Sequence, residues 1–189
     1  MGVTYPIRNK DELDAFKKYY LCRKKWRNYL LIIMGLNTAL RISDLLNLQW
    51  IDVYDYRKHC YRKHICLTEQ KTGKSNQIAI NNALKQALEY CRNNQSPDSY
   101  LFCVSNDETH PISRCQAWRI IKKAAVDTGL DEHISCHSMR KTFGYHAWKQ
   151  GVPPAMLMNI YNHSSYQITK RYLGIEQEDK DDVFRKIMI

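Results

Sequence analysis

A histidine–arginine pair and a later histidine–tyrosine pair in the C-terminal part of the chain are of types that handle phosphate. His137 and Arg140 are three residues apart in a helical pattern, so both side chains should lie on one helix face. Tyr172 is the ninth residue after His163. A fixed guanidinium and imidazoles can bind phosphate oxygens, and a tyrosine hydroxyl can attack phosphorus. The types and spacing therefore predict a site for phosphate chemistry.

Three helices joined by turns should position these side chains within residues 137–174. Gly151 and Pro153 are typical of the end of one helix and the start of the next. Ser165 is a suitable N-cap for a last short helix that carries Tyr172. A helix–turn–helix–turn–helix array can bring all four groups together.

A second arginine lies in the segment 36–48. A turn at Asn37 and Thr38 should precede a helix with Arg41 in its first turn and Leu45 among its core residues. A cation is electrostatically unfavourable at the positive end of a helix, so Arg41 is a candidate for binding an anionic ligand. An ordinary surface arginine is the alternative.

Residues 50–80 read as a three-stranded meander with strands Ile51–Tyr56, Ile65–Glu69 and Gln77–Ile80. The turn between the last two strands carries Lys71 and Lys74 on either side of Thr72 and Gly73. Either lysine could reach a ligand, and both could equally be turn residues that protect the edge of a sheet.

The remaining helices are predicted at about residues 9–22, 26–35, 81–94 and 113–128, with Asn9 and Ser113 as N-caps. The apolar run 29–34 must be buried. In the last of these helices, we expect Trp118, Ile121 and Ala125 to form the core face. The acidic tail 176–189 carries four apolar side chains, Val183, Phe184, Ile187 and Met188, that need a surface on which to dock.

Together these motifs resemble the tyrosine recombinase (phage integrase) family. The family has a T-G-L-R-I-S-E-L box, a hairpin lysine in a K-T-G setting, an H-x-x-R motif, and a G-H pair followed after nine residues by a tyrosine. The chain departs from these patterns at five positions without losing a reactive group: Ala39 for Gly, Asp44 for Glu, Met139 for Leu, Lys141 for His, and Asn162 for Gly. Asn162 tolerates a left-handed backbone nearly as well as glycine.

The resemblance implies a mixed, mainly α fold: a helical DNA-breaking and rejoining domain with a small three-stranded antiparallel sheet. It covers essentially the whole chain, so we expect one catalytic domain at 1–189, with an N-terminal helix at about 1–20. Most family members also carry an N-terminal core-binding domain, which we do not expect here. The tail 176–189 would dock on a neighbouring protomer, or else pack on its own.

The resemblance also implies a role for each motif residue. Arg41 and Arg140 would bind the non-bridging phosphate oxygens with His163. Tyr172 would attack phosphorus after His137 takes its proton, and Lys71, or less well Lys74, would protonate the leaving 5′-hydroxyl. Asp44 would support the site from behind. The product is a 3′-phosphotyrosyl intermediate, formed without metal, ATP or cofactor. Only the spacing from His163 favours Tyr172 over Tyr161 and Tyr166.

The chain has 29 Lys and Arg against 19 Asp and Glu, a formal charge of +10. A merely solvated basic surface would account for this charge, but nucleic acid is the better-fitting partner because neutralised phosphates release counterions. Candidate DNA contacts lie in basic patches and helix faces: Lys24, Lys25, Lys74, Arg114, Arg119, Lys122, Lys123, Lys141 and Lys170.

The seven cysteines show no C-x-x-C pair, and their number is odd, so we expect no disulfide framework. The His59, Cys60, His64 and Cys66 cluster lacks the tight ligand pairs typical of zinc sites, and we expect no metal. No apolar run approaches the roughly 20 residues of a membrane span. We therefore expect a cytoplasmic, nucleoid-associated protein.

Within the family, the resemblance implies a site-specific recombinase of integrase or invertase type. Its partners would be double-stranded DNA, three further copies in a homo-tetramer on two paired sites, and possible accessory DNA-bending or directionality proteins. A type IB topoisomerase-like activity and a non-cleaving DNA-binding regulator are the alternatives. The sequence does not separate integration, excision, inversion and dimer resolution.

Overall fold

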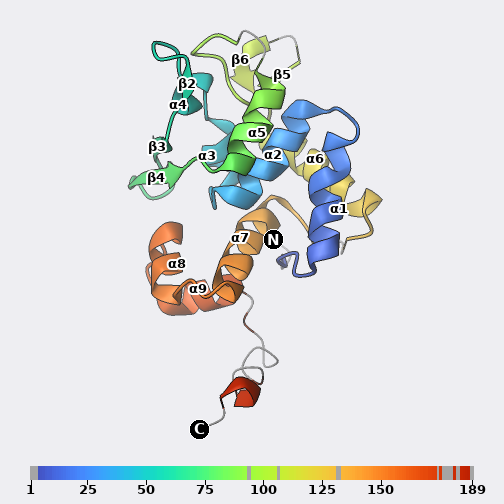
Figure 1. Ribbon diagram of the computed structural model, residues 1–189, viewed down its shortest axis with the longest axis vertical. Coiled ribbons are helices and arrows are strands. Elements are labelled where there is room, and N and C mark those ends of the chain that lie inside the picture. The colour runs from blue at the N-terminus through green and yellow to red at the C-terminus, as the bar shows by residue number, and fades with distance from the viewer. Residues whose placement is uncertain are drawn as a thin grey trace.

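The computed structural model describes residues 4–92, 95–105, 107–130, 133–173, 175, 181 and 184–187. Its helices are α1 (Lys10–Leu21), α2 (Trp26–Asn37), α3 (Ile42–Leu46), α4 (Trp50–Val53), α5 (Asn82–Cys91), α6 (Arg114–Asp127), α7 (Cys136–Lys149), α8 (Pro154–Tyr161) and α9 (Tyr166–Leu173). Figure 1 shows α2 in the middle of the molecule, with α7, α8 and α9 grouped on one side of it. None of the described helices is long and apolar enough to cross a membrane.

The strands form hairpins rather than a meander. They are β1 (Tyr54–Asp55), β2 (Cys60–Tyr61), β3 (His64–Thr68), β4 (Ser75–Ala79), β5 (Cys103–Val104) and β6 (Asp107–Pro111). Each pairs antiparallel with one neighbour, which gives three two-stranded sheets in the described part of the chain. The mainly helical fold with small antiparallel sheets is confirmed, but the three-stranded sheet is wrong. The first half of the expected first strand lies in the short helix α4, which begins with a capping box between Gln49 and Asp52.

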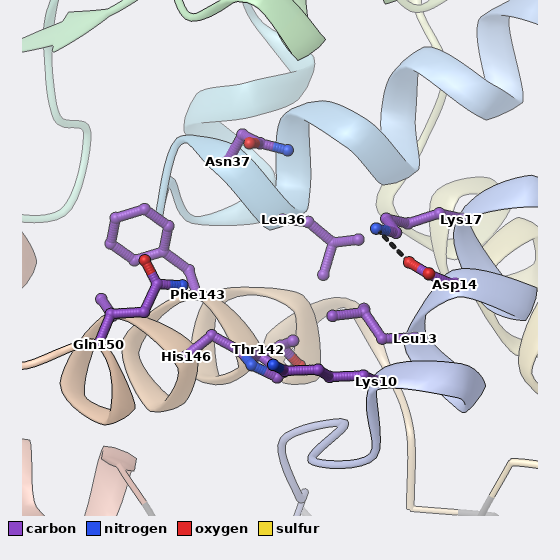
Figure 2. A pocket seen from close by; sticks show the side chains of 11 residues that line it. Lys10, Leu13, Asp14, Lys17, Leu36, Asn37, Thr142, Phe143, His146 and Gln150 are labelled. Carbon is purple, nitrogen blue, oxygen red and sulfur yellow. Dashed lines mark ion pairs between the residues drawn. The ribbon is translucent and has the colours of Figure 1, made fainter.

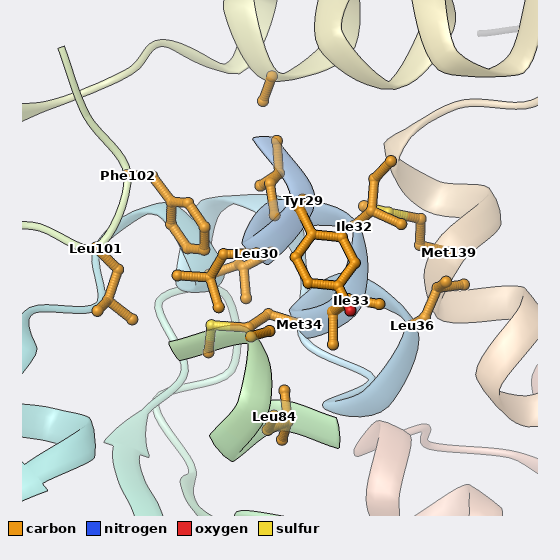
Figure 3. Packing of buried hydrophobic residues seen from close by; sticks show 14 of the residues in the cluster. Tyr29, Leu30, Ile32, Ile33, Met34, Leu36, Leu84, Leu101, Phe102 and Met139 are labelled. Atoms are coloured by element: carbon orange, nitrogen blue, oxygen red, sulfur yellow. The ribbon is translucent and has the colours of Figure 1, made fainter. Parts of the chain in front are cut away.

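Helix α2 is the centre of the hydrophobic core. Every residue from 29 to 36 is buried, as the apolar run predicted. Figure 3 shows these side chains between Leu84 of α5, Phe102 and Met139 of α7. Burying a single Leu or Ile side chain contributes about 1.5–3 kcal/mol, so this helix is the main source of stability for the elements around it.

The helix α2 ends at Asn37, two residues later than the sequence predicted. Gly35 does not stop it, because the glycine faces α7 and lies directly against the side chain of Met139. Its missing Cβ allows the two helices to approach closely. The predicted N-caps are confirmed at α1 and α6: Asn9 accepts from the amides of Asp11 and Glu12, and Ser113 forms a capping box with Gln116.

The predicted core face of α6 is partly wrong. Trp118 is 48% exposed, whereas Ala117 and Ala124 are buried beside the expected Ile121 and Ala125. The small alanines let α6 pack close to α1, α2 and α7. Because the face of α6 that carries the alanines is turned inward, Trp118 lies at the surface.

Helices α7, α8 and α9 enclose a second, smaller core around Leu157, Tyr161 and Leu173. Gly144 of α7 makes this packing possible. A Cβ at this position would overlap the Tyr161 hydroxyl and lie 2.9 Å from Leu173 Cδ2. In the tail, Val183 and Met188 lie outside the described residues, and Phe184 and Ile187 are exposed.

We expect Gly144→Ala to lower the free energy of unfolding by about 1–3 kcal/mol, measured by thermal or urea unfolding, because the Tyr161 ring is fixed on both sides. Gly35→Ala is the matched comparison. There the new methyl group meets the flexible Met139 side chain, and higher helix propensity offsets part of the strain. An equal or larger loss in Gly35→Ala would contradict this account of the two contacts.

Candidate active site

Arg41 lies directly before α3, as its N-cap residue, rather than in the first turn. The chain turns sharply just ahead of it, where Ala39 has a φ of 55°. That left-handed conformation costs an alanine about 1–2 kcal/mol, and the family pattern has glycine at this position. The guanidinium of Arg41 forms an ion pair with Glu69 through Nη1. Its other N–H groups have no partner in the part of the chain that the structure describes, so they can bind an anion.

Arg140 is 2% exposed and projects from α7 between two other segments of the chain, one containing Ala39 and one containing Tyr161. Its Nη1 donates to the carbonyl of Ala39 and its Nη2 to the carbonyl of Tyr161, the latter at 2.8 Å. Its Nε has no hydrogen-bond partner among the described residues. The strained turn at Ala39 thus directs its carbonyl onto Arg140 and fixes both arginines relative to each other.

The fully buried Tyr161 lies beneath the site. Its hydroxyl donates to the carbonyl of Arg140 at 2.8 Å, and the Arg140 guanidinium lies over its ring at 4.7 Å from the centroid. The ring of His163 stacks on it, with 5.0 Å between centroids and 24° between planes. The chain reaches His163 through Asn162, which has the expected left-handed conformation (φ 54°, ψ 38°). Thr169 of α9 holds the ring through a 3.0 Å contact between Oγ1 and Nδ1.

Tyr172 and His137 face each other across α9 and α7. The tyrosine hydroxyl is 3.1 Å from Nδ1 of His137 and nearer still to Nε2. The Tyr172 ring also meets the edge of His163 and lies 5.9 Å from the Arg140 guanidinium. Of the alternative tyrosines, Tyr161 already donates its hydroxyl hydrogen to the carbonyl of Arg140, and Tyr166 is exposed. The spacing rule therefore selected the tyrosine that contacts a base.

Burial and neighbouring positive charges keep both histidines unprotonated at neutral pH. Desolvation and the nearby Lys141 and Arg140 charges lower the pKa of His137 to about 4. Desolvation, together with Arg140 and Arg41, likewise lowers the pKa of His163 to about 4. Burial raises the pKa of Tyr172, although the arginines oppose this shift. The hydroxyl is thus protonated at neutral pH and touches an unprotonated imidazole.

The candidate lysines are at the tip of the β3–β4 hairpin. Lys71 and Lys74 are exposed, and no contact of either amine is seen among the described residues. The structure brings together Arg41, His137, Arg140, His163 and Tyr172, but it does not bring Lys71 into contact with them. The hairpin is nevertheless tied to α3, because Asp44 accepts a 3.0 Å hydrogen bond from the amide of Gln70. Asp44 thus connects α3 to the hairpin, and its support of the catalytic residues stays a prediction.

Sequence reasoning missed Glu69 and Thr169, and it considered Tyr161 only as an alternative nucleophile; all three are fully buried. The signal for Glu69 was available, because period-two alternation from the buried Ile65 places it on the inner face of β3. An acid at such a position needs partners.

The candidate DNA contacts are spread over several elements. Most are exposed: Lys24, Lys25, Lys74, Arg114, Arg119, Lys123 and Lys170. Lys122 is partly buried. Lys141 differs from the others, since it donates to the carbonyl of Thr4 and lies 5.7 Å from the Tyr172 ring centroid. It is a neighbour of the site rather than a remote backbone contact.

A separate groove of about 450 Å³ lies between α1, the end of α2 and α7 (Figure 2). It is lined by the other side of α7, including Thr142, His146 and Gln150, and by the Asp14–Lys17 ion pair. None of the six candidate catalytic side chains lines it. The described residues also contain no group of three or more His, Cys, Asp or Glu side chains that could hold a metal.

Several known proteins are similar to this chain in sequence. A sequence model of the phage integrase family matches residues 9–178. The chain is 42% identical over 178 residues to the probable integrase/recombinase YoeC of Bacillus subtilis (strain 168), a match that covers 94% of this chain and 93% of YoeC. A tyrosine recombinase of Pseudothermotoga lettingae is 28% identical over 167 residues, 87% of this chain but only 55% of that protein.

Solved structures share the fold. The crystal structure of XerA recombinase has a TM-score of 0.77 at 19% identity, covering 100% of this chain and 68% of that one. The structure of a lambda integrase dimer bound to a COC′ core site has a TM-score of 0.66 at 19% identity, covering 100% of this chain and 65% of that one.

The two depressed histidine pKa values predict a pH dependence of stability. Between pH 6.5 and about 4 the unfolded chain binds protons at His137 and His163 that the folded chain does not. The contribution of the two neutral histidines to the free energy of unfolding is therefore fully present above pH 6.5 and is lost as pH falls toward about 4. Thermal unfolding of a His137→Gln/His163→Gln double variant should show a shallower loss over this range. The exposed His64→Gln serves as control, and a double-variant slope equal to that of wild type would refute the assignment.

Proposed function

This chain belongs to the phage integrase family of tyrosine recombinases, and we propose that it cleaves and rejoins double-stranded DNA through a covalent bond between Tyr172 and a 3′-phosphate. The observation that carries the proposal is the contact between the Tyr172 hydroxyl and the neutral His137 ring, beside two fixed arginines. In this proposal Tyr172 would be the nucleophile, His137 the base, and Arg41 with Arg140 the pair that binds the phosphate.

Arg41 and Arg140 would act on the phosphate. The pentavalent transition state carries more negative charge on its non-bridging oxygens than the ground state, and preorganised guanidiniums stabilise the difference. Arg41 has N–H groups available, and the Nε of Arg140 has no partner among the described residues. His163 would add a hydrogen bond to the same oxygens through the ring nitrogen that Thr169 leaves unoccupied.

His137 would accept the proton of Tyr172 as the hydroxyl oxygen attacks phosphorus. This step needs a base because burial raises the pKa of the tyrosine, and a histidine with a pKa of about 4 is unprotonated and available at neutral pH. The bond from phosphorus to the 5′-oxygen breaks, and that oxygen must take up a proton. Lys71 is our choice of donor and Lys74 the weaker one. Their exposed hairpin would have to close over the bound DNA.

The 3′-phosphotyrosyl bond conserves the energy of the phosphodiester, so a 5′-hydroxyl can rejoin it without ATP, metal or cofactor. Rejoining to a different strand gives recombination. The names of the relatives, all recombinases or integrases, support this outcome over relaxation by a topoisomerase or binding without cleavage. We place the protein on chromosomal or mobile-element DNA in the nucleoid.

DNA binding would use the exposed basic residues, in keeping with similar integrase structures that were solved in complex with DNA. Exchange between two duplexes needs four active sites, so we include a homo-tetramer in the proposal. The exposed Phe184 and Ile187 of the tail could dock on a neighbour. Accessory DNA-bending or directionality proteins would act on this assembly.

The covalent step can be tested with nicked duplexes tiled from the DNA that flanks the gene, incubated with protein in EDTA. We expect a protein–DNA band on a denaturing gel that disappears in Tyr172→Phe. Tyr166→Phe, which removes an exposed hydroxyl six residues earlier, should retain the band. A band that survives Tyr172→Phe would identify another nucleophile, and no band with any duplex that the protein binds would refute cleavage.

Tail docking can be tested by sedimentation of the protein with and without residues 176–189 on paired DNA sites. We expect the truncated protein to bind a single site but to lose the tetramer, because the apolar tail side chains would no longer bridge protomers. Equal assembly of both proteins would show that the tail packs within its own chain.

A further inference from the structure

The inference concerns Glu69, the acidic residue directly after β3. It is the one carboxylate in the described part of the chain with zero exposure. A buried charge is unfavourable unless it is paired and hydrogen-bonded, so its partners indicate why it is retained. Burial alone would raise the pKa of Glu69, but hydrogen bonds from Arg41, Thr72 and Asn162 hold the pKa below its ordinary value.

The hydrogen-bond partners of the Glu69 carboxylate come from two separate segments of the site. Arg41 Nη1 pairs with Oε2 from the turn before α3. Thr72 Oγ1 donates to Oε2 at 2.9 Å and Asn76 Nδ2 to Oε1 at 3.1 Å, both from the hairpin that carries Lys71. The side chain of Asn162, directly before His163, also lowers the pKa of Glu69.

The same residue also fixes the hairpin through its backbone. The amide of Glu69 donates to the carbonyl of Lys74 at 3.0 Å, and its own carbonyl accepts from Gly73 at 2.8 Å. Gly73 has a φ of 66°, a conformation suited to glycine. The position of Lys71, between Glu69 and Thr72, therefore depends on contacts that Glu69 makes on both sides of it.

We propose that Glu69 is a positioning residue that holds Arg41 and the Lys71 hairpin in one arrangement before DNA binds. This inference rests on the proposed function. Glu69 touches no reacting atom and acts through the side chains that do. By engaging only Nη1 of Arg41, it sets the orientation of the guanidinium and leaves the other donors for phosphate.

A role in positioning predicts a particular kinetic result. Misplacement of a reacting group by about 1 Å can cost about 100-fold in rate. Removal of the Glu69 charge should therefore slow cleavage far more than it weakens binding, because the exposed basic residues that hold the DNA backbone are unchanged. A purely structural role would lower stability and affect binding and cleavage together.

The first experiment compares Glu69→Gln with wild type in single-turnover formation of the covalent complex on a nicked duplex. We expect the rate to fall about 10- to 100-fold. Affinity for the same duplex, measured in a Tyr172→Phe background to prevent cleavage, should change less than about 3-fold. Glu89→Gln is the matched control, since Glu89 also accepts from a neighbour, the Tyr61 hydroxyl, but lies outside the site. It should match wild type.

The second experiment asks whether Glu69 acts through Arg41. In an Arg41→Lys background, Glu69→Gln should slow cleavage much less than it does in wild type, because the side chain it orients has already been replaced. Fully multiplicative effects of the two substitutions would overturn the proposal. So would a wild-type cleavage rate in Glu69→Gln.

Thr72→Val covers the case in which Glu69→Gln does not fold. Thr72 is only partly buried in the hairpin, so the fold should persist while the 2.9 Å hydrogen bond to Glu69 is lost. We expect cleavage to slow by about 3- to 10-fold with unchanged affinity. An unchanged cleavage rate in this variant would overturn the proposal. If wild type itself forms no covalent complex, the proposed function and this inference fail together, whereas failure of the variants alone removes only the inference.

Discussion

The burial of Arg140 is the constraint on which the site depends. Its two terminal nitrogens donate to the carbonyls of Ala39 and Tyr161, which lie far apart in sequence. A buried guanidinium tolerates few alternative positions, because any shift would leave a charged donor without a partner. The segment before Arg41 and the segment before His163 are therefore held in a fixed relation by one side chain, and α7 supplies it.

Much of this arrangement could be predicted from residue types and spacing. The H-x-x-R pair falls on one helix, the glycine and prolines at 151–154 separate α7 from α8, and Tyr172 meets His137. These features depend on local rules, namely helix periodicity and turn chemistry. The roles of the side chains in catalysis remain a proposal, as does the reach of Lys71.

Features set by packing between distant segments could not be predicted. Trp118 has the type of a core residue, but the small Ala117 and Ala124 turn α6 so that it is exposed. The helix after Gln49 is a different case, because its capping box is a local pattern that the sequence reasoning overlooked. Glu69 could have been placed on the inner face of its strand, but its partners come from segments whose approach only the folded chain defines.

The neutral histidines have a consequence for how the site senses its ligand. His137 and His163 resist protonation first because burial desolvates their rings, and then because basic side chains lie beside them. A phosphodiester bound between Arg41 and Arg140 would offset the second of these causes, since its negative charge would oppose the positive field at both rings. Occupancy of the phosphate site and protonation of the two histidines are therefore thermodynamically linked.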